Sequence, residues 1–267
     1  MSRKLLPLIF AILCFIILVV SGVKIVLWKI DSEKTNSEIT ELQEKTSVSE
    51  VEDDSADVIP SDEDSSEDDL YWQFLKTPLL SVDLSALKQE NSDTVGWLKL
   101  EGTNVNYPFV KTSNNKFYLS HSFSKSYNSA GWVFLDYRNS SALSDKNSII
   151  YAHGRTDNTM FGSLRNLLSA SWRANPNNYL IRTVTASSSN VYQIFSVDLS
   201  PATSDYLKIS FNSNAGFKAF ADELLSRSDF DFKTSVSETD KILTLSTCYD
   251  NSRRLVVHGK LIKTLQN

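Results

Sequence analysis

The sequence predicts a mainly β protein in which short strands form a closed or nearly closed barrel behind a separate apolar helix. Eight β-rich runs with turn residues between them indicate the barrel, and one stretch of helical period lies among the later runs. Nineteen uncharged residues near the N-terminus indicate the separate helix. At 267 residues the chain fits one sizeable domain with accessory segments better than two large catalytic units.

The N-terminal apolar run, residues 5–23, reads LLPLIFAILCFIILVVSGV. As a helix it spans about 28 Å, close to the roughly 30 Å of a hydrocarbon core. A cleaved signal peptide would have a shorter apolar core and a small-x-small site, whereas this run resumes after Lys24 without an Ala-x-Ala pattern. We therefore predict an uncleaved transmembrane anchor over residues 1–30. Basic residues flank the run on both sides, so charge alone leaves its topology open.

Residues 31–69 hold sixteen of the thirty-two acidic side chains, two lysines and no aromatic residue. Such a segment buries too little apolar surface to offset the entropy of ordering. The composition predicts an acidic, disordered tether over residues 31–70, extended by its like charges, and one domain over residues 71–267. Residues 71–267 hold twenty-one Lys and Arg against sixteen acidic residues, which suits an anionic surface or substrate or, more simply, reflects scattered surface lysines.

Within the domain, periodicity predicts short N-terminal helices at residues 71–75 and 84–87. A longer amphipathic helix at residues 214–226 is inserted before the strand that ends at Cys248; it either covers one side of the barrel or shapes a groove. The predicted strands are residues 96–100, 104–110, 131–136, 148–153, 179–184, 191–199, 242–248 and 255–262.

The chain has two cysteines, Cys14 in the apolar run and Cys248 in the domain. A lone thiol in the folded part of an exported protein is unusual, because oxidising compartments favour paired cysteines or none. Cys248 ends the run KILTLSTC just before a polar turn, where a scaffold can hold a nucleophile rigid yet exposed. A small buried hydrophobic residue is the other interpretation.

Of the three histidines, His153 ends the run SIIYAHG, where Gly154 breaks the strand. It is a candidate general acid or base, or a turn residue. His121 lies in a polar loop, and His258 in the terminal strand is expected to be partly exposed and structural. The spacings predict no metal site and no cofactor, and the sequence lacks phosphate-cradling glycine loops and basic stretches with interleaved aromatics, so we expect no nucleic-acid partner.

Two arginines, Arg253 and Arg254, follow the turn after Cys248. In a tight hairpin only one of them can face the thiol, because adjacent strand residues point to opposite faces. Period alone does not say which. The facing arginine would favour the thiolate and could bind an oxyanion through its fork of donors.

Together these residues resemble the sortases, the transpeptidases that attach secreted proteins to Gram-positive cell walls. The matching motifs are TLSTC at residues 244–248, the Arg254-Leu-Val-Val-x-Gly pattern and YAHG at residues 151–154. The helical lead-in and the helix at residues 214–226 resemble class B sortases. So do the segments NSDTVGWLKLEGTNVNYPFV, FYLSHSF, GWVFLDYRN and TMFGSLRNLL. The resemblance covers about residues 71–263.

The resemblance implies an eight-stranded sortase β-barrel with Cys248 as nucleophile, His153 as proton donor and acceptor, and Arg254 as oxyanion and transition-state stabiliser. It implies a C-terminal sorting signal as substrate, akin to NPQTN in class B members, many of which serve iron or haem acquisition. The acceptor would be a cell-wall precursor amine or a pilin lysine. A single-pass membrane protein with an extracellular catalytic domain follows. Only five residues separate Cys248 from Arg254, where relatives often carry more, so the substrate groove beside this turn is not carried over.

Three other functions fit parts of the pattern. One is a class B-type pilin polymerase that joins pilin subunits. Another is a plain cysteine endopeptidase. Papain-like thiol proteases, however, require an Asn or Asp that orients the histidine and a cysteine at a helix N-terminus. Hydrolysis fits better as a slow side reaction. The third is an inactive surface adhesion or scaffold barrel, in which Cys248 would resist alkylation at neutral pH.

Overall fold

The computed structural model describes residues 5–52, 57–58, 69–202, 205–248 and 252–267. Its N-terminal half contains α1 (Leu5–Lys45), β1 (Val48–Val51), β2 (Asp57–Val58), α2 (Asp69–Leu75), β3 (Leu79–Val82), α3 (Ser85–Glu90), β4 (Thr94–Leu100), β5 (Asn106–Val110), η1 (Phe117–Leu119) and β6 (Phe134–Leu135). Then come β7 (Asn147–Ala152), η2 (Gly162–Leu168), α4 (Ala170–Arg173), η3 (Pro176–Tyr179), β8 (Leu180–Thr185), β9 (Ser188–Pro201), α5 (Asn214–Ser226), β10 (Ile242–Cys248) and β11 (Arg253–Gln266).

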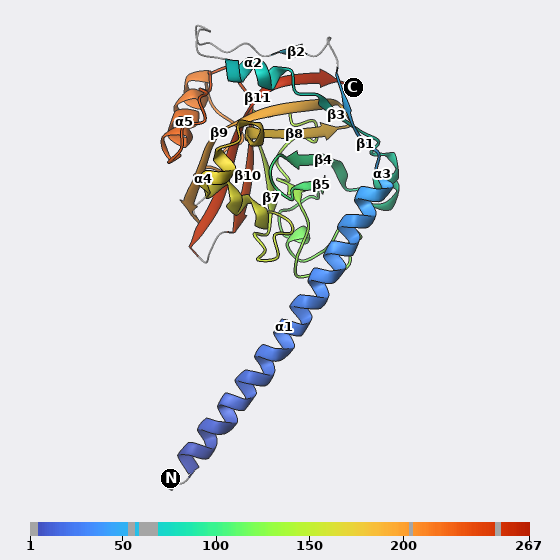
Figure 1. Ribbon diagram of the computed structural model, residues 1–267, viewed down its shortest axis with the longest axis vertical. Coiled ribbons are helices and arrows are strands. Elements are labelled where there is room, and N and C mark those ends of the chain that lie inside the picture. Colours follow the sequence, from blue (N-terminus) through green and yellow to red (C-terminus); the bar gives the residue numbers. More distant parts are fainter. Residues whose placement is uncertain (1–4, 53–56, 59–68, 203–204, 249–251) are drawn as a thin grey trace.

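In the described part of the chain, eight strands close into a mixed barrel in the order β10-β7-β6-β5-β4-β8-β9-β11, and β11 pairs with β10 to complete the circle. The pairs β7–β10 and β5–β6 are parallel, and the other pairs of the circle are antiparallel. Figure 1 shows the barrel above α1, with α2 at one end. The predicted mainly β barrel is confirmed.

The strand alternation of β10 explains how it is buried on both faces. Leu243 and Leu245 are fully buried in the main core, whereas Ile242 joins a second apolar cluster with Phe217 and Val256. This second cluster includes the buried stripe of α5, so α5 covers the outer face of the barrel at this wall. The helix begins where Ser213 accepts a hydrogen bond from the backbone N–H of Gly216.

One predicted strand is shorter than expected. Residues 131–136 were predicted as a strand, but β6 contains only Phe134–Leu135. Gly131 has a φ of 61°, and the N–H of Trp132 donates to the carbonyl oxygen of Tyr118 at 2.9 Å. The segment before β6 therefore pairs with the η1 turn rather than extending the strand.

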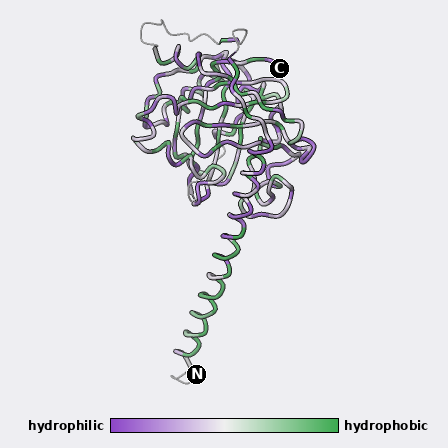
Figure 2. The backbone as a smooth tube through the Cα atoms, turned by 45° about the vertical axis from the view of Figure 1, so that its right-hand side comes forward, coloured by the Kyte–Doolittle hydropathy of each residue, from purple (hydrophilic) through white to green (hydrophobic). Residues whose placement is uncertain are grey.

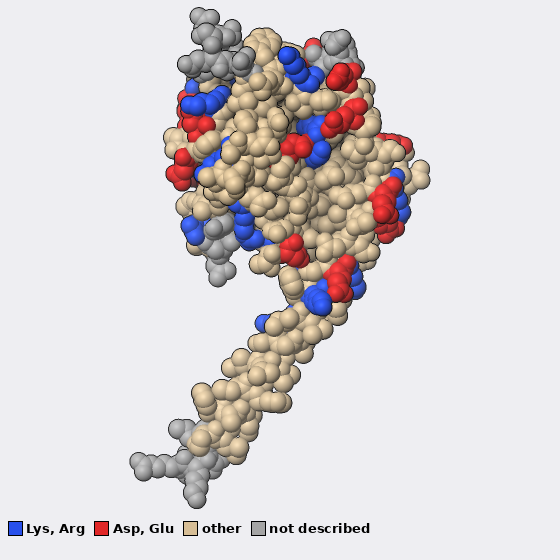
Figure 3. Space-filling view, viewed as in Figure 1, with Lys and Arg blue, Asp and Glu red and all other residues tan. Residues whose placement is uncertain are grey.

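The N-terminal helix α1 is one continuous element of 41 residues. Its first half is apolar and exposed: Phe10 is 69% and Leu18 70% accessible. Among the described residues it is the one helix long and apolar enough to cross a membrane. Figure 2 shows this half as a hydrophobic stalk outside the barrel, and in Figure 3 charged side chains gather where α1 reaches the barrel.

The structure differs from the disordered tether predicted for residues 31–70. The helix α1 continues to Lys45, and β1 pairs with β3 from Val48 opposite Val82 to Val51 opposite Leu79. Residues 53–56 and 59–68 of the predicted tether lie outside the described residues. The composition misled because α1 packs on the barrel largely through small polar side chains: Ser32 is 7% and Thr35 1% exposed, alongside Leu42 at 1%.

Candidate active site

Strand register brings the three candidate residues to one edge of the barrel. Cys248 on β10 lies opposite Arg254 on the antiparallel strand β11. On the other side of β10, Thr247 is paired with Ala152 of the parallel strand β7, so the next position along β7 is His153. The side chain of Cys248 lies outside the described residues, and its place therefore comes from this backbone register.

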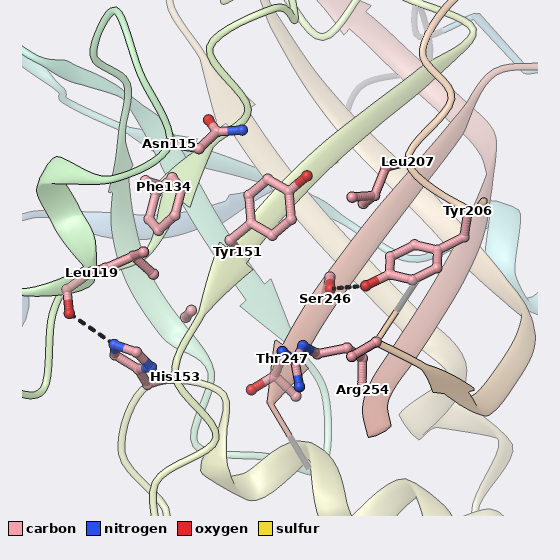
Figure 4. Close-up of a pocket in the computed structure, with 12 residues that line it drawn as sticks. Asn115, Leu119, Phe134, Tyr151, His153, Tyr206, Leu207, Ser246, Thr247 and Arg254 are labelled. Carbon is pink, nitrogen blue, oxygen red and sulfur yellow. Dashed lines mark hydrogen bonds between the residues drawn. The ribbon is translucent and has the colours of Figure 1, made fainter. Parts of the chain in front are cut away.

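A cavity of about 640 Å³ opens at the same edge. Figure 4 shows His153 and Arg254 on either side of Thr247 at one end, with Tyr151 and Tyr206 along the walls. Arg253 is exposed and is not among the lining residues. The lining residues are Asn115, Leu119, Phe134, Tyr151, Ala152, His153, Ala202, Tyr206, Leu207, Ser246, Thr247 and Arg254.

The imidazole of His153 is half-buried and is held by the chain around it. Its Nε2 lies 2.8 Å from the carbonyl oxygen of Leu119, and its own carbonyl oxygen accepts from the N–H of Phe161 at 3.0 Å. Arg165 closes the turn after β7 by donating to the carbonyl oxygens of Gly154 and Arg155 at 2.9 and 3.0 Å. The ring therefore has a fixed place at the cavity edge.

The guanidinium of Arg254 is half-buried and lines the cavity. Its Nη1 donates to the carbonyl oxygen of Arg253 at 3.1 Å. Directly opposed positions on antiparallel strands share a face, so the register selects Arg254 over Arg253 as the arginine on the face of position 248. A planar, permanently charged fork at this place can favour a thiolate and bind an oxyanion.

Comparisons with known proteins identify the family of the chain. The Sortase domain family model matches residues 98–262. Sortase B of Staphylococcus aureus is 32% identical over 182 residues, which are 67% of this chain and 74% of that protein. The chain belongs to the sortase family. Its sortase domain resembles class B sortases in structure as well: sortase B from B. anthracis in complex with AAEK1 has a TM-score of 0.69 at 27% identity, covering 88% of this chain and 99% of that one. The S. aureus sortase B–substrate complex has a TM-score of 0.62 at 32% identity, covering 67% and 83%.

One wall of the cavity in this sortase depends on Asn147, which the sequence analysis did not single out. Asn147 is fully buried; its Nδ2 donates to the carbonyl oxygen of Lys208 at 2.8 Å, and its Oδ1 accepts from Thr244 Oγ1 at 2.7 Å. The segment held in this way carries Tyr206 and Leu207 into the cavity. The sequence feature that could have indicated this role is the polar Asn147 at the start of the β-rich run that forms β7.

A second set of polar contacts holds Tyr151 against the cavity. Its hydroxyl donates to Asp136 Oδ2 at 2.9 Å, and Asn115 Nδ2 donates to the same oxygen at 3.0 Å. Although burial opposes it, the hydrogen bonds from Arg138, Tyr151 and Asn115 hold the pKa of Asp136 below its ordinary value. Burial and the neighbouring Asp136 raise the pKa of Tyr151, so this phenol stays protonated at neutral pH.

The other two histidines of this sortase lie away from the cavity lining. His121 stacks on Phe117 with ring centroids 4.1 Å apart. His258 is fully buried, not partly exposed as expected, because β11 lies between β9 and β10 beneath α5. Burial lowers the pKa of His258 to about 3, and its Nδ1 lies 2.9 Å from Thr244 Oγ1. It is a neutral core residue.

Replacing Asn147 by alanine is expected to lower the free energy of unfolding by about 2 kcal/mol. The reason is that the carbonyl oxygen of Lys208 and the hydroxyl of Thr244 lose their hydrogen-bond partner. The KM for a peptide substrate should rise, since the segment carrying Tyr206 loses its attachment to β7. Thermal unfolding and steady-state kinetics measure the two effects. The exposed Asn177→Ala is the matched control, and equal KM values in both variants would contradict the role assigned to Asn147.

Proposed function

We propose that this sortase is a membrane-anchored cysteine transpeptidase that cleaves the C-terminal sorting signal of secreted proteins and transfers them to a cell-wall amine. The observation that supports the proposal is the strand register: Cys248 is paired with Arg254, and Thr247 is paired with Ala152, the residue before His153. His153, Thr247 and Arg254 line one cavity. In this proposal an extended peptide binds in the cavity, and the similar S. aureus sortase B structure is a substrate complex.

In the proposed reaction the sulfur of Cys248 attacks the carbonyl carbon of the scissile peptide bond. Arg254 donates hydrogen bonds to the oxyanion that forms. When the C–N bond breaks, the departing amine takes a proton from His153, which leaves a thioester on Cys248. An acceptor amine then attacks the thioester, His153 takes up the proton released, and the thiolate departs.

The fraction of molecules that hold Cys248 as thiolate and His153 as imidazolium limits the rate of the proposed reaction. With ordinary pKa values of about 8.5 for the thiol and 6.5 for the imidazole, fewer than about one molecule in a hundred would hold thiolate and imidazolium together at pH 7. The positive charge of Arg254, on the strand position opposite Cys248, acts to increase the thiolate fraction. A charge pair about 4 Å apart contributes roughly 4 kcal/mol at an effective dielectric of 20, so a close imidazolium would do the same.

The exposed apolar half of α1 supports the membrane anchor. We propose a single-pass protein with the catalytic domain outside the cell, where sorting signals and wall precursors are found. Resistance to alkaline extraction tests the anchor. Removal of the catalytic domain by protease added to intact cells tests the orientation, and protection of that domain would overturn it.

The reaction is tested with the full-length chain in detergent micelles and a panel of sorting-signal peptides, including NPQTN, with and without candidate amines. We expect intact-mass spectrometry to trap a thioacyl adduct and to show an amide product only when an amine is present. Peptides that are never cleaved, together with a thiol at Cys248 that resists alkylation at neutral pH, would overturn the proposal in favour of an inactive barrel.

A further inference from the structure

The second half of α1 lies on two segments that surround His153. One is the Arg155 turn, defined as residues 153–162, and the other is the Leu119 loop, defined as residues 111–133. Figure 1 shows α1 meeting the barrel on the side of these connections, and the hydrogen bonds below identify the contacts. The contacting α1 residues, which we call the clamp, are Asp31, Ser32, Thr35 and Glu38.

Ser32 makes the contact with the Arg155 turn. Its Oγ donates to Asp157 Oδ2 at 2.7 Å and accepts from the guanidinium of Arg155. Arg155 also forms an ion pair with Asp157 at 2.9 Å, and its guanidinium lies 5.5 Å from the ring centroid of Trp28. Ser32 and Arg155 are 7% and 8% exposed, so these bonds form in a site shielded from water.

The electrostatics of the turn agree with a tight contact. Although burial opposes it, hydrogen bonds from Arg155, Ser32 and Thr159 hold the pKa of Asp157 well below its ordinary value. Asp157 is therefore ionised at neutral pH. Hydrogen bonds to a charged acceptor are about twice as strong as neutral ones, so Ser32 meets the turn through a strong bond.

The other three clamp residues contact the Leu119 loop. Asn128 Nδ2 donates to Thr35 Oγ1 at 3.0 Å, and the N–H of Ser129 donates to Asp31 Oδ2 at 3.2 Å. Glu38 Oε1 accepts from Ser122 Oγ at 3.1 Å and from the N–H of Ser124 at 2.8 Å.

Both of these segments contact His153 directly. In the Leu119 loop, the carbonyl oxygen of Leu119 lies 2.8 Å from His153 Nε2. The Arg155 turn begins at His153, and near its end the N–H of Phe161 donates to the carbonyl oxygen of His153. Cys248 and Arg254, by contrast, lie on β10 and β11, which are joined to each other by strand pairing. The clamp therefore acts on the position of His153, whereas strand pairing fixes the positions of Cys248 and Arg254.

We propose that Ser32 is a positioning residue for His153, and that the docked half of α1 fixes the imidazole for proton transfer. The inference rests on the proposed function, in which His153 moves the proton. General acid–base catalysis needs the donor within hydrogen-bond reach of the reacting atom, and a misplacement of about 1 Å can lower a rate by about a hundredfold. The N-terminal helix is then part of the catalytic apparatus as well as an anchor.

The test compares Ser32→Ala with Ser37→Ala in the full-length chain in detergent micelles. Ser37 is an exposed serine on the same helix and serves as the matched control. We expect Ser32→Ala to lower kcat about tenfold, with KM within about twofold of the wild type. Alkylation of Cys248 should still go to completion, because β10 and β11 keep their pairing, but more slowly than in the wild type if the displaced imidazolium no longer favours the thiolate.

A second pair of variants tests the other segment. Thr35→Val removes the hydroxyl that accepts from Asn128 at nearly constant volume, whereas Thr35→Ser keeps it. We expect the valine variant to lose kcat and the serine variant to retain it. If Ser32→Ala does not fold by thermal unfolding and circular dichroism, the Thr35 pair carries the test.

The imidazole can also be followed directly, because the chain has three histidines. In NMR spectra of histidine-labelled protein we expect Ser32→Ala to shift or broaden the ring resonances of His153 and to leave those of His258 unchanged. Wild-type kcat and an unchanged His153 signal in both Ser32→Ala and Thr35→Val would overturn the inference. An inactive wild-type enzyme would overturn the proposed function instead, and the His153 resonances would still decide whether the clamp holds the ring.

Discussion

Replacing Cys248 by alanine is expected to abolish the thioacyl adduct and to lower transpeptidation by about 10⁴-fold or more. The reason is that no other group in the proposed reaction can form the covalent intermediate, and loss of a nucleophile removes the chemistry that the other catalytic residues support. Intact-mass spectrometry of the enzyme with a sorting-signal peptide, together with the rate of peptide cleavage, measures the loss.

The chain supplies its own control for this variant. Cys14 is the other cysteine and is exposed on the apolar half of α1, far along the chain from the barrel. Cys14→Ala should form the adduct at the wild-type rate. An adduct of undiminished yield in Cys248→Ala would place the nucleophile elsewhere and remove the basis of the proposed mechanism.

Arg254→Ala is expected to lower kcat/KM by about 10²- to 10³-fold, the range typical of a lost oxyanion donor. Arg254 lies opposite Cys248 in the β10–β11 register and its side chain lines the cavity. Arg254→Lys should recover only part of the loss, because an ammonium group keeps the charge but not the planar fork of donors. Steady-state kinetics with one peptide and one amine gives the comparison.

The adjacent arginine is the matched control for this prediction. Arg253 is exposed and directly precedes Arg254 on β11, so its side chain lies on the opposite face of the strand from Arg254. Arg253→Ala should change kcat/KM by less than about twofold, as expected for an exposed side chain away from the cavity. Equal losses in the two alanine variants would show that net charge at the hairpin, and not an oriented guanidinium, supports the reaction.

The barrel was predictable because its signals are local. Strand alternation and turn residues located all eight strands, and the helical stripe at residues 214–226 coincides with α5. The strand predicted at residues 131–136 was four residues too long, since the pairing of Trp132 with Tyr118 depends on a contact between loops. The strand predicted at residues 104–110 began two residues before β5. Strand ends also indicated His153 and Cys248 as candidates. Strand period left Arg253 and Arg254 open and the resemblance favoured Arg254, which the register places opposite Cys248.

Contacts between distant polar side chains were not predictable. The attachment of Asn147 to the segment carrying Tyr206 joins residues 59 or more positions apart. The clamp was missed for a related reason: Ser32 and Thr35 are buried by hydrogen bonds to loops more than ninety positions away, and an acidic, Ser-rich composition gives no indication of such partners. Disorder inferred from low hydrophobicity assumes that apolar burial is the main source of order.

In the proposed membrane-anchored enzyme, the continuity of α1 limits the distance between the barrel and the membrane. With residues 5–23 in the bilayer, as proposed, Ser32 lies nine positions beyond, a rise of about 14 Å at roughly 1.5 Å per residue. Headgroups occupy about 5 to 8 Å of that height on each side. Because Ser32 contacts the turn that follows His153, the reactive end of the barrel would work just above the lipid surface. A continuous helix of this length would hold the active site close to the membrane. Both the protein to be attached and its acceptor would therefore have to approach the lipid surface.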